Sequence, residues 1–153
     1  MKTRTLTLAL VAGLAIWSIL PADSVLTPVS QEAFLERAEA GADAPFVLDV
    51  RTAEEFVAGH VPGAVNIPHD QLAARLAEVP KDKDVVLYCR SGKRAGIAGQ
   101  VLADNGYARL QHLEGDMPGW IEKGRPVETP KDAAACVAAL SSGGPAQTAC
   151  AAN

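Results

Sequence analysis

Residues 85–99 read VVLYCRSGKRAGIAG, and this stretch decides both the fold and the chemistry that we expect. Val85–Tyr88 is an apolar run of β-forming residues without alternation, which is typical of a strand buried on both faces of a parallel sheet. Cys89 follows at the carboxyl end of that strand, and a short polar loop then leads into a helical pattern. The N–H groups of the turn, the positive end of the helix dipole and three nearby cationic side chains all favour a thiolate there. The stretch therefore predicts a reactive cysteine at the edge of a sheet.

Residues 1–22 have the pattern of an export signal. Lys2 and Arg4 form a basic start, residues 6–20 carry no charge, and Ala22 is a small residue suited to a cleavage point. The apolar run is short for a membrane-spanning helix, which needs about 20 residues. We therefore expect a cleaved signal and a periplasmic protein, with an inner-membrane anchor formed by an uncleaved signal as the alternative. Association with a membrane is expected only in that second case.

The charge balance argues against one class of partner. Removal of residues 1–22 leaves 12 basic residues against 18 acidic ones, and the chain has few aromatic residues. Such an acidic chain gives no support to nucleic-acid binding. The remaining length suits a single domain with one core.

The chain has three cysteines, and an odd number in an exported protein suggests one disulfide and one free thiol. Cys136 and Cys150 lie near each other in the sequence and are the natural pair, which leaves Cys89 free. Unpaired tail cysteines, or a bond to another chain, are the alternatives.

Strand and helix patterns alternate along the chain. Strands are expected at 24–27, 46–50, 64–67, 85–88 and 108–113. Helices are expected at 31–40 after Ser30, from the Thr52–Glu55 capping box to residue 58, after Asp70, at 95–105, at 118–123 and at 131–140. This order predicts an α/β fold around a mostly parallel sheet, with the active site at the carboxyl ends of the strands. Asp49, Arg51 and Cys89 all follow such ends.

A thiolate in a glycine-bearing loop can support acyl transfer, phosphate-ester hydrolysis, peroxide reduction or sulfur transfer. Acyl transfer needs a histidine base, and spacing does not show that His60, His69 or His112 reaches Cys89. Dithiol exchange of the thioredoxin type needs a Cys-x-x-Cys motif, which the sequence lacks, and no metal ligands cluster in it. A nucleophile activated by dipoles and cations, suited to an anionic substrate, remains.

Several motifs in the right order resemble the rhodanese family. They are LDVR at 48–51, EEF at 54–56, GHVPGAVNIP at 59–68, VVLYCRSGKR at 85–94, and LEG at 113–115 with Gly119 and Trp120. The resemblance covers residues 25–127 and is strongest to single-domain periplasmic rhodaneses of the phage-shock type. It implies a three-layer α/β/α rhodanese-like fold around a five-stranded, mostly parallel sheet. It also divides the chain into a signal at 1–22, a rhodanese domain at 23–127 and an Ala/Ser/Gly-rich tail at 128–153.

The resemblance further implies a mechanism. The Cys89 thiolate attacks the outer sulfur of thiosulfate and holds it as a persulfide, which cyanide or a thiol then takes. The loop residues cradle the persulfide, Lys93 and Arg94 attract the anionic donor, and Asp49 and Arg51 brace the surrounding loops. The cradle consists of Arg90, Ser91, Gly92, Lys93 and Arg94. No metal or organic cofactor is implied, and we expect a monomer.

Two other functions remain open. The Cys-x4-Arg spacing from Cys89 to Arg94 is one residue shorter than in the related cell-cycle phosphatases, which makes a phosphatase the weaker enzyme hypothesis. A non-catalytic rhodanese module that binds sulfane sulfur or a partner protein is the other alternative, although such modules typically lose the cysteine. Arg94 could instead pair with a surface carboxylate.

Two residues depart from the family pattern. Ala95 stands where many relatives place a hydroxyl residue, and Asp116 stands where a second glycine is usual after Gly115. Both departures could alter the rate or the preferred donor, while the nucleophile and its cradle remain.

Overall fold

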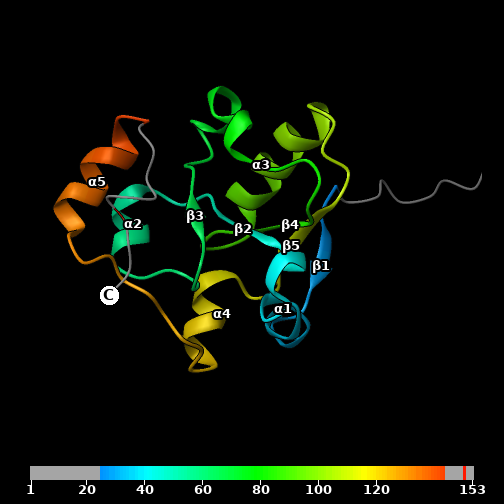
Figure 1. Cartoon of the computed structure of the whole chain (residues 1–153), viewed down its shortest axis with the longest axis horizontal. Helices are drawn as coiled ribbons and strands as arrows, with labels where there is room; N and C mark the ends of the chain where they lie inside the picture. The colour runs from blue at the N-terminus through cyan, green and yellow to red at the C-terminus, as the bar shows by residue number, and fades with distance from the viewer. Residues whose placement is uncertain (1–24, 144–149, 151–153) are drawn as a thin grey trace, which may run out of the picture.

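The computed structural model describes residues 25–143 and residue 150. Five parallel strands form one sheet in the order β1-β5-β4-β2-β3 (Figure 1). The strands are β1 (Thr27–Val29), β2 (Phe46–Asp49), β3 (Val65–Asn66), β4 (Val85–Tyr88) and β5 (Leu110–Leu113). The expected five-stranded parallel sheet is therefore confirmed, whereas the expected signal at 1–22 lies outside the described residues.

Helices cover both faces of this sheet (Figure 1). They are α1 (Gln31–Ala38), α2 (Ala53–Val57), α3 (Lys93–Asp104), α4 (Asp116–Glu122) and α5 (Ala133–Ser141), with short 3-10 turns η1 (Gly41–Asp43), η2 (Leu72–Ala74) and η3 (Leu76–Glu78). The helix α3 packs on one face, and α1 and α4 pack on the other. This is the three-layer α/β/α arrangement that the resemblance implied.

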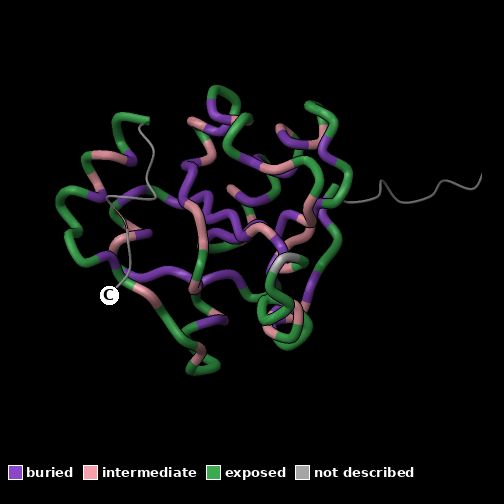
Figure 2. The backbone as a smooth tube through the Cα atoms, in the orientation of Figure 1, coloured by how far each residue is buried: buried purple, intermediate pink, exposed green. Residues whose placement is uncertain are grey.

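The central strand β4 explains why its sequence does not alternate. All four of its residues are buried, and Figure 2 shows burial concentrated along the middle of the sheet. Val85 and Leu87 join the core under α3, while Val86 and Tyr88 join the core under α1 and α4. A strand covered on both faces needs apolar side chains at every position.

The register of the sheet brings the carboxyl ends of β2 and β4 together. Asp49 lies opposite Tyr88, and the next residue of each strand leads into a loop at the same edge. The expected capping box starts α2 directly after β2, with the Thr52 hydroxyl accepting from the Glu55 N–H and the Glu55 carboxylate accepting from the Thr52 N–H. The Cys89 loop and the start of α2 therefore share one edge.

The helix expected after Asp70 is wrong. The turns η2 and η3 form there instead, and they are separated by Arg75 with a φ of −119°. The Tyr107 hydroxyl lies 2.6 Å from the Leu76 carbonyl oxygen and 3.0 Å from that of Val79. The hydroxyl of a distant residue thus bonds to carbonyls of this segment, while Leu72 and Val79 are buried in the core.

Element boundaries differ from expectation by one to three residues, most clearly in β1, α3 and α4. The edge strand is Thr27–Val29 rather than 24–27, and it includes Pro28, which is tolerated because β1 pairs only with β5. The helix α3 begins at Lys93 instead of residue 95, and α4 begins at Asp116 instead of residue 118. In both helices the preceding glycine adopts a left-handed conformation that opens the helix early.

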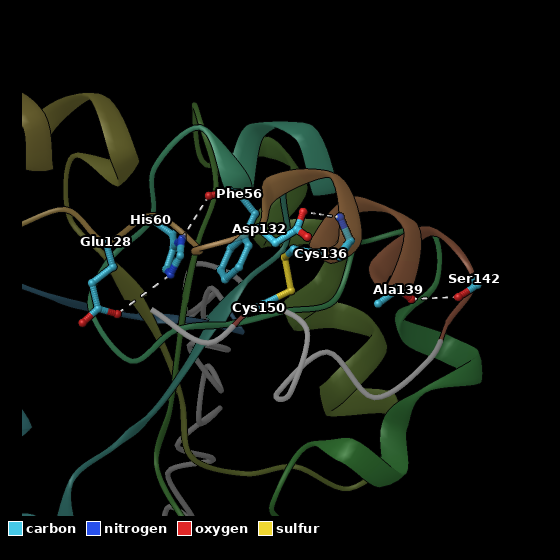
Figure 3. Close-up of a disulfide and its surroundings, with 9 residues drawn as sticks. Phe56, His60, Glu128, Asp132, Cys136, Ala139, Ser142 and Cys150 are labelled. Atoms are coloured by element: carbon cyan, nitrogen blue, oxygen red, sulfur yellow. Dashed lines mark hydrogen bonds and ion pairs between the residues drawn. A yellow bond between two sulfur atoms is a disulfide. The ribbon is translucent and has the colours of Figure 1, made fainter. Parts of the chain in front are cut away.

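The segment after residue 127 belongs to the folded unit. The helix α5 packs against α2, with Cys136 and Leu140 contacting Ala53 and Phe56 in a small core. A disulfide joins Cys136 to Cys150, as the cysteine count suggested (Figure 3). The tail is therefore anchored to the domain by apolar packing and by a covalent bond.

His60 holds the loop between α2 and β3. Its ring stacks on Phe56 at 3.7 Å, and its Nδ1 lies 3.0 Å from the Phe56 carbonyl oxygen (Figure 3). Its backbone pairs with that of Glu128 in an antiparallel bridge. Burial lowers the pKa of His60, so this buried ring favours the neutral form.

Within the described part of the chain, no helix is both long enough and apolar enough to cross a membrane.

Candidate active site

Cys89 lies at the carboxyl end of β4 and is fully buried. Its Sγ accepts two backbone hydrogen bonds, from the Ser91 N–H at 3.4 Å and the Gly92 N–H at 3.1 Å. Gly92 caps α3 with a φ of +79°, a conformation that glycine adopts without strain. The loop thus turns its N–H groups inward on the sulfur, as a backbone nest does around an anion.

A separate hydrogen bond holds the backbone N–H of Cys89. The Asp116 carboxylate accepts the Cys89 N–H at 2.7 Å, and the same carboxylate lies 3.1 Å from Nε2 of His112. Asp116 is 5% exposed and is the only non-glycine residue of the described chain with a positive φ, at +51°. Burial raises the pKa of Asp116, but the hydrogen bonds with His112 and Cys89 outweigh it and leave the pKa lowered. The carboxylate beside Cys89 is therefore charged.

Arg94, at the end of the cradle, pairs with Glu55 of α2. Its Nη1 and Nη2 donate to the two carboxylate oxygens at 2.6 and 2.9 Å. The ion pair with Arg94 lowers the pKa of Glu55 to about 2. Glu55 in turn raises the pKa of Arg94, and Cys89 adds to this rise. Arg94 therefore pairs with a carboxylate, the alternative that the sequence left open, and also interacts electrostatically with Cys89.

The other basic side chains of the loop are exposed. Neither Arg90 nor Lys93 forms a hydrogen bond or an ion pair with any described residue. Arg90 lines a pocket of about 530 Å³ beside the cradle, whereas Lys93 does not. The pocket wall consists of Arg51, Glu55, Arg90, Met117, Pro118, Ile121 and Glu122. Met117 connects this wall to the nucleophile, because its N–H donates to the Cys89 carbonyl at 3.1 Å.

Asp49 and Arg51 form a buried brace behind the site. Arg51 donates through Nε and Nη2 to the Asp49 carboxylate, with Nη2 at 2.6 Å, and also to the Gly59 carbonyl. The Tyr88 hydroxyl donates to Asp49 at 2.7 Å and accepts the Val61 N–H at 3.1 Å. This network ties the carboxyl ends of β2 and β4 to the loop between α2 and β3.

Among the side chains that the structure describes, no group of three or more His, Cys, Asp or Glu is arranged to hold a metal ion.

Comparison with known proteins agrees with this geometry. The family model for the rhodanese-like domain matches residues 30–123. The chain belongs to the rhodanese-like family. It is 39% identical over 85 residues to a sulfurtransferase of Allochromatium vinosum, covering 56% of this chain and 79% of that protein. It is 36% identical over 91 residues to the human thiosulfate:glutathione sulfurtransferase, covering 50% of this chain and 79% of that protein.

A solved structure shows the same fold. The rhodanese-related protein of Thermoplasma volcanium superposes with a TM-score of 0.59 at 29% identity, covering 66% of this chain and 96% of that one. The relatives support sulfur transfer as the general activity of this rhodanese.

Three residues of the rhodanese site were not assigned to it from the sequence. Glu55 was recognised only as a helix cap, Asp116 only as a departure from the family, and His112 was given no role. One signal was available: His112 and Asp116 are four residues apart on either side of Gly115, so a turn there could bring them together. The partner of Arg94, Glu55, lies 39 residues earlier in the sequence and has no local signal.

Proposed function

We propose that this rhodanese transfers a sulfane sulfur from thiosulfate, or a similar anionic donor, to a thiol or cyanide through a persulfide on Cys89. The observation that carries the proposal is the pair of N–H groups that Ser91 and Gly92 direct at Sγ of a free cysteine. Donors aimed at the sulfur stabilise negative charge there, first on the thiolate and then on the persulfide.

The first step is a displacement on sulfur. The Cys89 thiolate attacks the outer sulfur of thiosulfate, and an Sγ–S bond forms while the S–S bond of thiosulfate breaks. Sulfite leaves with the electron pair, and the terminal persulfide sulfur carries the negative charge. Arg94 faces the sulfur and offsets part of the charge that gathers there during the attack.

The second step regenerates the Cys89 thiolate. A thiolate acceptor attacks the terminal sulfur and leaves as a persulfide, whereas cyanide leaves as thiocyanate; in each case the Cys89 thiolate is the leaving group. No net oxidation occurs, because one sulfur atom moves between two nucleophiles. The name of the human relative, thiosulfate:glutathione sulfurtransferase, supports a small thiol as acceptor.

The pocket beside the cradle gives donor and acceptor a place to bind. Arg90 brings an unpaired positive charge to its rim, and Met117, Pro118 and Ile121 supply an apolar wall. An anionic donor is attracted by the charge, and an acceptor with an apolar part is held against the wall.

A phosphatase is the weaker alternative. The loop from Cys89 to Arg94 has only four intervening residues, and its N–H groups close tightly on a single sulfur atom. A non-catalytic module is disfavoured because the nucleophile and the donors around it are both present.

We further propose export to the periplasm and a monomeric state. The disulfide between Cys136 and Cys150 supports an oxidising compartment, since such bonds rarely persist in the cytosol.

Steady-state assays test the proposed reaction. Sulfite release from thiosulfate beyond one equivalent per protein should require an acceptor, and all sulfite release should be lost in Cys89→Ser. Ser91→Ala should remain active because the loop contributes the backbone N–H of this residue. Hydrolysis of an aryl phosphate without any sulfite release would contradict the proposal and favour the phosphatase.

A further inference from the structure

His112 and Asp116 form a pair that bonds to the backbone of Cys89 and lies beside Gly92 of the cradle. The Asp116 carboxylate holds the Cys89 N–H at the start of the loop. A Cβ at Gly92 would lie 3.3 Å from Cε1 of His112 and 3.6 Å from Oδ2 of Asp116, so the pair also lies directly against the residue whose N–H reaches Sγ.

The backbone of Asp116 shows that this arrangement is under constraint. A φ of +51° suits glycine and costs a side-chain-bearing residue energy, although Asp tolerates it better than most. Strain of this kind persists where the surrounding structure makes use of it. Here the side chain supplies a buried acceptor that glycine would lack.

The charge on Asp116 opposes the chemistry at Cys89 unless it is balanced. A buried carboxylate beside a thiolate disfavours the second negative charge, because the surroundings screen it weakly. His112 is the group that can balance it, since its Nε2 lies 3.1 Å from both carboxylate oxygens.

We propose that His112 and Asp116 are positioning residues for the sulfur-transfer reaction, and that protonated His112 neutralises the Asp116 charge so that the cradle can hold an anionic sulfur. The inference rests on the proposed function of Cys89. If His112 balances Asp116, the sulfur-transfer reaction depends on the protonation of His112, which the backbone N–H groups of the cradle alone would not cause.

The surroundings of His112 support this assignment. Asp116 of α4 and Glu114, which follows β5, are the acidic groups that act on it, and its neighbours across the sheet, Pro28 and Leu87, carry no charge. The hydrogen bond with Asp116 raises the pKa of His112 above its usual 6.5 despite partial burial. The ring therefore keeps its proton to a higher pH than an ordinary histidine and loses it as the pH rises through the raised pKa.

The test uses three variants of the full chain and one control. His112→Gln keeps an N–H donor toward Asp116 without a charge, Asp116→Asn keeps an acceptor for the Cys89 N–H without a charge, and the double variant combines them. His69→Gln is the matched control. Two quantities are followed against pH: kcat/KM for thiosulfate, and the thiolate fraction of Cys89 by ultraviolet absorbance with Cys89→Ser as blank.

We expect the wild-type kcat/KM to fall about three- to tenfold as His112 loses its proton, the size expected for one weakly screened charge. At pH values where the wild-type His112 is protonated, His112→Gln should show the lower kcat/KM and a smaller thiolate fraction, and its pH profile should lack that inflection. In the double variant, kcat/KM and the thiolate fraction should both return toward the wild-type values, because the amide introduced by Asp116→Asn carries no charge that needs to be balanced. The control should follow the wild type.

An unchanged inflection in His112→Gln, or a folded double variant as impaired as His112→Gln, overturns the proposal. If His112→Gln does not fold, the wild type still decides: the histidine titration followed by NMR must coincide with an inflection in the thiolate absorbance, and independent titrations refute the coupling. The protein could also lack sulfur transfer while the thiolate fraction of Cys89 still responds to His112 and Asp116 as expected. That result supports the coupling between His112 and Cys89 and refutes the proposed function.

Discussion

Arg94 and Glu55 hold each other through two short hydrogen bonds, at 2.6 and 2.9 Å, and thereby connect the last residue of the cysteine loop to the start of α2. The Thr52 cap uses the same Glu55 carboxylate. One side chain therefore positions both the helix that follows β2 and the cation that faces Cys89.

Replacing Arg94 by Ala should impair sulfur uptake more than stability. Loss of the cation facing the sulfur should lower kcat/KM for thiosulfate by roughly 10- to 100-fold, the range for one charged donor at a reacting centre. Arg37→Ala is the matched control, because Arg37 also pairs with a carboxylate, Asp84, but away from the site. Equal losses in the two variants would argue against a role of Arg94 in the reaction.

Replacing Glu55 by Gln should reduce stability in a way that depends on pH. The pKa of Glu55 is about 2 in the folded chain against an ordinary value of 4.5, so the pair contributes fully above 4.5 and is lost as the pH falls through about 2. Since the pair is partly exposed, the loss near neutral pH should be at most about 1 kcal/mol. Urea denaturation of both proteins should show this difference shrinking in acid. A constant difference down to the lowest pH would contradict the assignment.

Replacing Tyr88 by Phe should destabilise the domain by about 1–3 kcal/mol, the cost of leaving buried polar groups without a partner. The hydroxyl serves both Asp49 and the Val61 N–H, and no water can replace it if the site stays closed. Chemical denaturation measures the change. A loss below about 0.5 kcal/mol would show that the network finds another partner.

Removing the disulfide with Cys136→Ser and Cys150→Ser should lower the free energy of unfolding by about 3 kcal/mol, as for a closed loop of this length. One thiol should titrate in the folded, oxidised protein, and three after denaturation and reduction. Three thiols before reduction would contradict the pairing, and an unchanged unfolding midpoint in the double variant would show that α5 does not depend on it.

The predictable parts of this molecule are local. The burial of β4, the Ser30 and Thr52 caps and the exposed cationic loop after Cys89 all follow from residues close in sequence. The helix expected after Asp70 is replaced by two 3-10 turns, and the Leu76 and Val79 carbonyls of this segment lie within hydrogen-bond distance of the hydroxyl of Tyr107, more than 25 residues away. Local patterns carry no information about such a partner.

In the candidate site, too, the features set by neighbouring residues are predictable and those set by distant residues are not. Cys89 and its N–H donors were identified from the sequence because a strand, a glycine and a helix start define them locally. The His112–Asp116 pair depends on a left-handed aspartate, a conformation that its residue type does not predict. The Arg94–Glu55 pair depends on how two helices meet at one sheet edge.

The most direct test of the central claim is the mass of the intact protein after brief exposure to thiosulfate and removal of small molecules. We predict the added mass of one sulfur atom, located on Cys89, released by a thiol and missing in Cys89→Ser. No added sulfur on the wild type, or the same addition in Cys89→Ser, would contradict a persulfide carried by Cys89.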